Sequence, residues 1–136
     1  MEEDLRVRRA RRDDLARVWA LLGREMPPTR ADRKRFRRLV GTLREDLYVA
    51  ERGAEAALLG LALVVYVRGL GPPTAIVRRL EGASPSVAAL LLDRAVVRAR
   101  ARGCTSLELL SPTGRPAPAG PPWTVGAQTL VRAVAP

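Results

Sequence analysis

The segment EGASPSVAALLLDRAVVRARARG, residues 81–103, carries signals for both ends of a helix. Ser84 is a favourable N-cap residue, and Pro85 suits the first helical position, where a backbone N–H would have no partner anyway. Gly103 is the expected cap after the last turn. The apolar positions recur at helical spacing and predict one buried stripe, formed by Ala88, Leu91, Leu92, Ala95, Val96 and Ala99. The segment therefore predicts a long helix with one buried face.

The sequence before this helix predicts a strand and two helices. Alternation over residues 5–9 is typical of a strand. A first helix follows, with Asp13 as its N-cap and an apolar face formed by Leu15, Val18, Trp19 and Leu22, and Pro27 and Pro28 end it. A second helix is predicted within residues 30–46, with Phe36, Leu39, Val40 and Leu43 on its buried face.

The remaining segments have the sequence patterns of strands and turns. Residues 47–52 and 57–69 are rich in β-branched and aromatic residues, and the glycine-containing turn between them predicts a hairpin. Further strands are predicted at 74–82 and 104–110. Residues 111–122 contain too much proline and glycine for a regular element, and strand-like alternation returns at 124–134. The chain thus alternates strands and helices, as a mixed α/β protein does.

Length and composition restrict the class of protein. The chain has 136 residues, 47% of them hydrophobic and 28% charged, which predicts one soluble globular domain over residues 1–136. The longest apolar run is too short to span a bilayer, and no signal-peptide core opens the sequence, so we expect a cytoplasmic protein with no membrane partner. Because there is one cysteine and no histidine, internal disulfides, the usual zinc sites and histidine-based triads are excluded. We expect no metal.

The net charge is +10, and Lys34 is the one lysine among the 24 basic residues. Arginine binds phosphate in bidentate fashion, so an anionic partner must be considered. Residues 30–44 carry the most densely packed positive charge of the chain, and they are where an acidic partner or nucleic acid would dock. A genome-wide preference for arginine also explains the composition, and nucleic acid is the less favoured partner because few aromatic residues could stack bases.

The order of predicted elements, with the segments LRVRRARRDDLARVWALL and ALLLDRAVVRARARGCTSLELLSPTGRP, resembles the GNAT superfamily of acetyltransferases. This resemblance covers the chain from about Leu5 to Leu110. It implies an α/β fold with a mixed, mainly antiparallel central sheet flanked by helices. The helix that family members have after the fifth strand is expected to be shortened or missing, because residues 113–122 read TGRPAPAGPP. It further implies acetyl-CoA as cofactor and a small-molecule or peptide amine as acceptor.

The resemblance also implies where acetyl-CoA would bind. The pantetheine arm would lie along Ile76, Val77 and Arg78, and the pyrophosphate would rest on backbone amides of residues 86–89, that is, Ser86, Val87, Ala88 and Ala89. In the family these amides belong to a [QR]-x-x-G-x-[GA] turn, where glycine lets the backbone approach the anion. Here residues 83–88 read ASPSVA, so serine replaces the glycine and Pro85 removes one N–H. A plainly capped helix without a ligand is the competing interpretation.

Catalytic residues stay unassigned at this stage. The asparagine and tyrosine that family members carry after the fifth strand have no counterpart in residues 111–122. Glu81 or Glu108 could accept a proton from the amine, although each is also explained as an ordinary surface carboxylate. Tyr66 and Cys104 are better explained as core-facing strand residues. The alternative function is therefore a catalytically inactive GNAT-fold module that binds or regulates an acidic partner or nucleic acid through residues 30–44.

Oligomeric state is a further expectation. A terminal strand at 124–134 beside a missing helix would expose an edge or an apolar face, and a second copy of the chain could cover it. A homodimer is the assembly that this pattern predicts.

Overall fold

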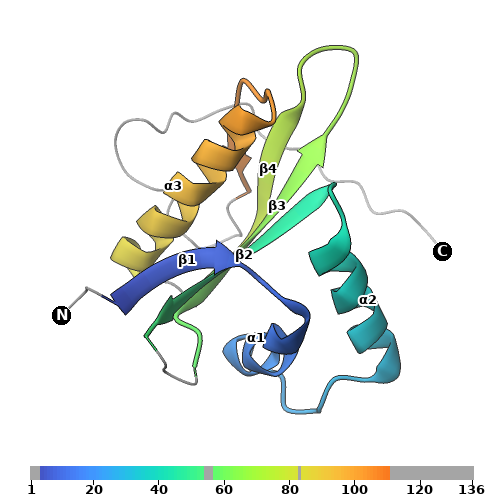
Figure 1. The fold of residues 1–136 in the computed structure, drawn as a ribbon, viewed down its shortest axis with the longest axis vertical. Coiled ribbons are helices and arrows are strands. Elements are labelled where there is room, and N and C mark those ends of the chain that lie inside the picture. Colours follow the sequence, from blue (N-terminus) through green and yellow to red (C-terminus); the bar gives the residue numbers. More distant parts are fainter. Residues whose placement is uncertain (1–3, 54–56, 83, 111–136) are drawn as a thin grey trace.

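A five-stranded sheet runs through the part of the chain that our computed structural model describes, namely residues 4–53, 57–82 and 84–110 (Figure 1). The strands lie in sequence order and are β1 (Leu5–Arg9), β2 (Glu45–Arg52), β3 (Gly60–Val67), β4 (Thr74–Glu81) and β5 (Leu107–Leu109). Neighbouring strands from β1 to β4 are antiparallel, whereas β5 pairs with β4 in parallel. A parallel partner is reached through a crossover, which here is a helix.

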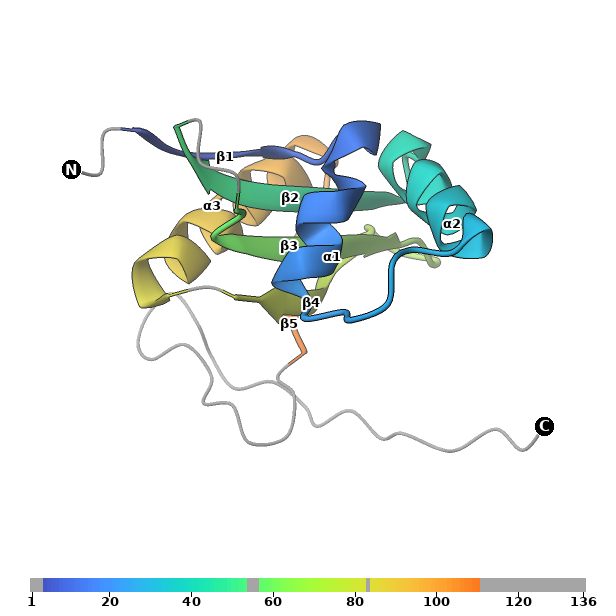
Figure 2. The ribbon, with the colours of Figure 1, turned by 90° about the horizontal axis from the view of Figure 1, so that it is seen from below.

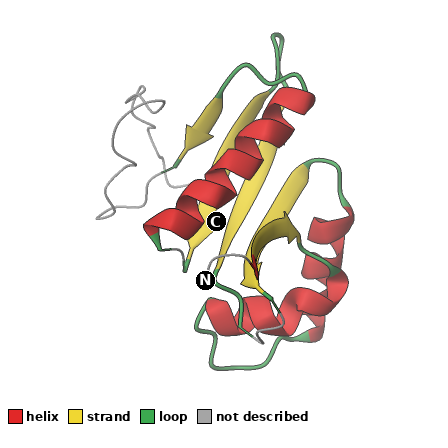
Figure 3. Cartoon of the chain, turned by 60° about the vertical axis from the view of Figure 1, so that its left-hand side comes forward, coloured by secondary structure: helices red, strands yellow, loops and turns green. Residues whose placement is uncertain are grey.

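Helices cover both faces of this sheet (Figure 2). The crossover helix α3 (Pro85–Ala101) packs on one face, and α1 (Leu15–Leu21) and α2 (Arg30–Gly41) lie on the other (Figure 3). A single turn of 3-10 helix, η2 (Arg12–Asp14), joins β1 to α1. The expected mixed, mainly antiparallel sheet flanked by helices is confirmed.

Strand alternation separates two apolar cores. Toward α3, strand residues such as Ala50, Val64 and Val77 pack against the buried stripe of the helix, which is formed by Val87, Leu91, Leu92, Ala95 and Ala99. Toward α1 and α2, Val49 and Leu61 pack with Val18 and Phe36. The sheet is buried on both faces at its centre, which explains why its strands read as nearly continuous apolar runs.

Three local expectations need correction. Asp13 is exposed and is not the N-cap of α1, because the η2 turn comes first and α1 begins at Leu15. Leu43 lies beyond the end of α2 and is exposed. On α3, Val87 is buried while Ala88 is partly exposed, so the buried stripe begins one residue earlier than the spacing indicated. The expectations for residues 111–136, including the missing helix and the terminal strand, lie outside the described residues.

A buried carboxylate fixes the C-terminal end of α3 to the sheet. Asp46, at the start of β2, accepts hydrogen bonds on Oδ2 from the hydroxyls of Tyr66 (2.6 Å) and Tyr48 (3.2 Å). Its ion-pair partners are Arg9 of β1, Arg98 of α3 and Arg102, the residue that caps α3, at 3.2, 3.8 and 3.9 Å. The Arg102 guanidinium also lies over the ring of Tyr66, and its Nη1 donates to the carbonyl oxygen of Leu43. A charge inside a protein is tolerated only with such partners.

The environment of Asp46 keeps both tyrosines protonated well above their ordinary range. Burial raises the pKa of Tyr48 to about 12, and the neighbouring Asp46 charge acts in the same direction. Burial and the hydrogen bond to Asp46 raise the pKa of Tyr66 still further. Both hydroxyls therefore act as donors at neutral pH, which is what a buried carboxylate requires.

We expect the two tyrosines to differ in their contribution to stability. Tyr66→Phe removes the short hydrogen bond to a buried charge, so the free energy of unfolding should fall by about 1.5–3 kcal/mol. Tyr48→Phe removes the longer bond to the same oxygen, and the loss should be smaller. Urea denaturation of both variants and the wild type measures this difference. Equal losses, or none, would contradict the role given to Tyr66.

A second ionic cluster holds α1 on the opposite face. Glu51 of β2 accepts from Nε of Arg6 and of Arg8, at 2.8 and 2.9 Å, and from Arg17 at 3.1 Å. Arg8 also donates to both oxygens of the buried Asp14 at 2.8 and 2.9 Å. The hydrogen bond from Arg8 is the main cause that lowers the pKa of Glu51 to about 2, with Arg6 and Arg17 adding to it. Arg8 likewise lowers the pKa of Asp14.

This cluster predicts a defined loss of stability in acid. Because the pKa of Glu51 is lower in the folded chain than its ordinary value of 4.5, its contribution is complete above about pH 4.5 and disappears as the pH falls toward 2. The stability difference between wild type and Glu51→Gln should therefore shrink over that interval, as measured by urea denaturation at several pH values. The control is Glu108→Gln, an exposed carboxylate outside the cluster. A difference that did not change with pH would count against the assignment.

Candidate functional site

The sheet is irregular near the middle of β4. Opposite β3, the pairing shifts between Leu63 and Val64, which face Arg79 and Val77, so Arg78 is one extra residue in β4. Such a β-bulge bends the strand and increases its twist. On the other side, the register with β5 ends at Val77 and Leu109, and the N–H of Leu110 donates to the carbonyl oxygen of Val77 at 3.1 Å. The pairs observed between β4 and β5 therefore end at Val77, just before the bulge, and Leu110 is the last described residue of that segment.

The three residues expected to line a pantetheine arm fall on both sides of this point. Ile76 and Val77 belong to the paired part, where Ile76 lies opposite Val65 of β3 and the Val77 carbonyl bonds to Leu110. Arg78 is exposed at the bulge itself. Of the three, Arg78 is the one left out of the strand register.

The N-terminus of α3 lies directly after this part of β4. Ser84 has the extended backbone of an N-cap residue, and its Oγ accepts from the N–H of Val87 at 3.4 Å, a long hydrogen bond. The N–H of Ala88 donates to the carbonyl oxygen of Ser84 at 2.8 Å, so it is already used inside the helix. Ala89 belongs to the same regular ladder. The amides left for an anion are those of Ser86 and, after displacement of the Ser84 hydroxyl, Val87.

Gly82 joins β4 to the loop before α3 and contacts α1. Its φ is +67°, a conformation that favours glycine, and a Cβ placed there would lie 2.5 Å from Cδ1 of Leu21. The last turn of α1 therefore packs directly on the end of β4. Beyond it, the Trp19 indole N–H donates to the carbonyl oxygen of Met26 at 3.1 Å and the Arg24 guanidinium lies over the Trp19 ring. These contacts hold the start of the α1–α2 connection against α1.

Two carboxylates on β4 and β5 share the face covered by α1 and α2. Glu81 lies opposite Leu61 of β3, a residue of the core beneath α1, and directly opposed strand residues share a face. Glu108 lies beside Ile76 in the paired part of the sheet, roughly 15 Å along the strands from Glu81. Glu81 forms an ion pair with Arg79 at 3.1 Å. Glu81 is the last residue of β4, so of these two carboxylates it lies nearer the N-terminus of α3.

The remaining candidate residues lie away from this region. Tyr66 is half-buried on the α3 face and bound to Asp46, and Tyr48, the other tyrosine of the sequence, has the same partner. Cys104 is partly buried against the α3 core. Both Tyr66 and Cys104 thus pack with the core, as expected. Within the described ranges, no group of three or more histidine, cysteine or acidic side chains could hold a metal, and no helix there could cross a membrane.

Sequence reasoning missed the residues that organise the site. The bulge at Arg78 leaves no mark in the strand pattern, and the buried Asp14, Asp46 and Glu51 read as ordinary surface carboxylates. One signal was present, since Asp46 and Glu51 directly flank the apolar run of residues 47–50 within one strand. A charged residue inside a largely buried strand indicates a buried ion pair.

No known protein-family model matches this chain, and no curated protein matches its sequence.

Solved structures match the fold closely. A transcriptional regulator from Bacillus halodurans C-125 has a TM-score of 0.69 and 21% identity, over 82% of this chain and 84% of that one. An acetyltransferase from Trypanosoma brucei has a TM-score of 0.67 and 18% identity, over 86% of this chain and 96% of that one. The protein TTHA1254 from Thermus thermophilus has a TM-score of 0.65 and 26% identity, over 94% of this chain and 99% of that one.

Most of the matching structures are described as acetyltransferases. At these identities the likeness establishes the fold. The described part of the chain has the GNAT acetyltransferase fold, with a bulge in β4 shortly before the crossover helix α3.

Two glycines with positive φ provide a test of the contact between α1 and β4. Gly82→Ala meets both an unfavourable backbone conformation and the Leu21 side chain, whereas Gly103→Ala, at φ +82°, meets no atom within 4 Å. We expect Gly103→Ala to cost about 1 kcal/mol of stability and Gly82→Ala clearly more. Leu21→Ala in the Gly82→Ala background should cost less than Leu21→Ala alone. Thermal or urea unfolding measures all four variants, and equal costs for the two glycine variants would contradict the contact.

Proposed function

We propose that this protein is a GNAT-type N-acyltransferase that takes an acetyl group from acetyl-CoA and transfers it to an amine. The observation that carries the proposal is the β-bulge at Arg78, a few residues before the N-terminus of α3. The extra residue of a bulge is left unpaired, and unpaired strand groups can pair with the amides of an extended ligand, in the way that strand addition works for peptides. The pantetheine arm of CoA is such a ligand.

The chain's own residues fit the two ends of this cofactor. Arg78, at the bulge, marks where the pantetheine amides would begin to replace β5. The N–H groups of Ser86 and Val87, with the positive end of the α3 dipole, would hold the pyrophosphate. Serine at position 86 keeps its N–H although it is not the glycine of the family motif, and it is exposed. The missing N–H of Pro85 reduces the number of donors without closing the site.

Acetyl-CoA supplies an activated thioester carbonyl, so the main task of the protein is to bring an unprotonated amine to it. The amine nitrogen forms the new C–N bond, the C–S bond breaks, and the nitrogen gives up one proton while the thiolate takes one. We propose that Glu81 accepts the proton from the nitrogen, because Glu81 ends β4 and lies on the face of the sheet that α1 covers. Both tyrosine hydroxyls already donate to Asp46. We therefore assign solvent as the source of the proton that the thiolate takes.

The acceptor amine would approach from the side of α1. Leu21 packs on Gly82, and the bonds between Trp19, Arg24 and Met26 fix the α1–α2 connection nearby. These residues are therefore proposed to form part of the wall against which the acceptor is oriented. A fixed wall favours catalysis because a small displacement of the nucleophile lowers the rate strongly.

Isothermal titration with acetyl-CoA and with CoA tests the cofactor site. We expect saturable micromolar binding by the wild type and at least a tenfold loss for Ser86→Glu, about 1.4 kcal/mol. This substitution places a negative charge among the proposed phosphate donors, yet an acidic residue in the first turn suits the helix dipole, so the fold should be retained.

The matched control is Thr105→Glu, which makes the same change of charge at an exposed position beyond the other end of α3. It should bind the cofactor within about twofold of the wild type, since the Debye length at physiological salt is about 8 Å. Absence of heat at millimolar cofactor would contradict the proposal. The chain would then keep the fold without the chemistry. Equal losses in both variants would mean that overall charge, rather than the α3 N-terminus, governs binding.

A further inference from the structure

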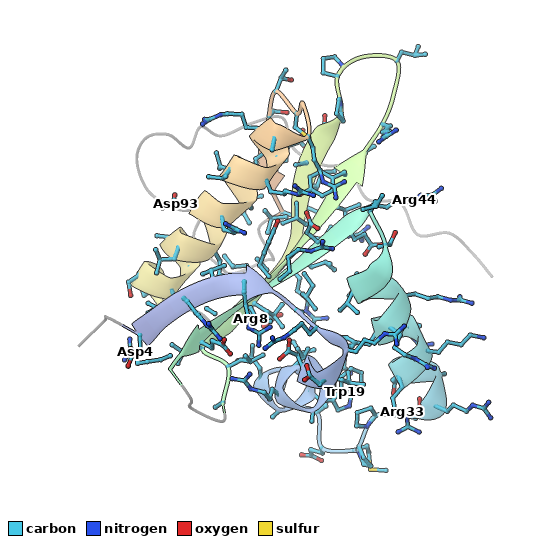
Figure 4. All side chains as sticks on the ribbon, in the orientation of Figure 1. Asp4, Arg8, Trp19, Arg33, Arg44 and Asp93 are labelled. Carbon is cyan, nitrogen blue, oxygen red and sulfur yellow. The ribbon has the colours of Figure 1, made fainter. Side chains whose placement is uncertain are left out.

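The outward side of α2 carries a stripe of basic residues. We call it the α2 basic stripe, and it consists of Arg30, Arg33, Lys34, Arg37 and Arg38. These positions follow the spacing i, i+3, i+4, i+7 and i+8, which places them on one side of a helix. All of them are exposed, and side chains of α2, with Arg33 labelled, extend away from the sheet in Figure 4. At 1.5 Å of rise per residue, the stripe is about 12 Å long.

The acidic residue of α2 does not neutralise this stripe. Asp32 accepts from the backbone N–H and the hydroxyl of Thr29, both at 2.9 Å, and pairs with Arg35 at 2.6 Å. It thereby completes the capping box at the start of the helix, on the flank that also carries Arg35. No residue of the stripe forms an ion pair with a described residue. Five positive charges therefore face solvent together without a counter-charge from the described part of the chain.

The opposite side of α2 is already occupied by the protein core. Phe36 is buried, and Leu39 and Val40 pack against the same cluster. A helix that binds a membrane surface must place an apolar face among the lipids, and α2 has none left to offer. An anionic bilayer is therefore not the partner that this helix fits.

The composition of the stripe also argues against a folded acidic protein. Protein interfaces gain most of their affinity from buried aromatic or aliphatic anchors surrounded by a polar rim. Between the cations of the stripe, the exposed side of α2 offers Ala31 and Gly41, which provide no such anchor. Nucleic acid needs no such anchor, because it gains affinity when basic residues release the counterions bound to its phosphates.

We propose that the α2 basic stripe binds the phosphate backbone of a nucleic-acid duplex without reading its sequence. Arginine matches phosphate with two parallel donors, and four of the five residues are arginine. Because B-form DNA carries one charge per about 1.7 Å of axis, a stripe of about 12 Å faces about seven phosphates. The stripe contains no aromatic side chain on which an unpaired base could stack, which favours duplex over single strand.

This surface is independent of the proposed acyl transfer. It lies on α2, whereas the cofactor site is assigned to β4 and the N-terminus of α3. Either assignment can fail while the other holds.

Fluorescence anisotropy with a labelled DNA duplex of about 20 base pairs tests the proposal, with an RNA hairpin and a single strand of equal length for comparison. If five phosphates are neutralised, the affinity of the wild type should fall about 500-fold between 50 and 200 mM salt. The triple variant Arg33→Gln, Lys34→Gln, Arg37→Gln keeps two cations of the stripe, and its affinity should fall only about 12-fold over the same range. Scrambled duplexes should bind equally.

The matched control is Arg12→Gln, Arg68→Gln, Arg100→Gln, which removes the same charge from exposed positions outside α2. It should keep a salt dependence close to that of the wild type. An equal effect in both triple variants would overturn the proposal in favour of general charge attraction. So would absence of duplex binding at about 50 mM salt, or tighter binding to polyglutamate or to phosphatidylserine vesicles than to the duplex. Preference for the single strand would overturn the duplex assignment.

Discussion

The burial of the Asp46 carboxylate is the constraint on which the arrangement of this sheet and its crossover helix depends. Removing a charge from water is costly, so the chain surrounds Asp46 with two tyrosine hydroxyls and with arginines from β1 and α3. Those partners are separated widely in sequence, and they meet only when α3 lies across β2 and β3 in one orientation. Because Arg98 and Arg102 are near the C-terminal end of α3, the contacts fix that end and direct the N-terminus of the helix toward the end of β4.

The position of the α3 N-terminus matters because the bulge in β4 precedes it by only a few residues. The extra residue at Arg78 twists β4 after its last pair with β5, and α3 begins a few residues later. Backbone amides of a strand and of a helix start are thereby placed near one another. Neither feature alone would define a site, since bulges and capped helices are common. Their combination, inside a fold shared with acetyltransferases, supports the proposed binding of an extended anionic cofactor.

The arginines of this protein serve at least two physical purposes that composition does not separate. Arg8, Arg9 and Arg98 compensate buried carboxylates and hold secondary elements together. The arginines of the α2 basic stripe face solvent and compensate nothing in the described residues. The net charge of +10 includes both groups. A basic composition therefore indicates a polyanion partner only where cations remain that do not pair with buried carboxylates. The α2 basic stripe consists of such cations.

Local sequence patterns were enough to predict the class of fold and most of its elements. Helical spacing, Ser84 and Pro85 located α3, and runs of β-branched residues located the strands, because local preference and burial act in the same direction there. These patterns did not predict the η2 turn before α1, the bulge at Arg78, or the partners of Asp14, Asp46 and Glu51. These features depend on contacts between residues far apart in the chain, such as Arg8 with Glu51, and no local pattern reports them. The same holds for the N–H groups at the start of α3. Only the observed hydrogen bonds showed that the N–H of Ala88 is used inside the helix, whereas that of Ser86 is left for a ligand.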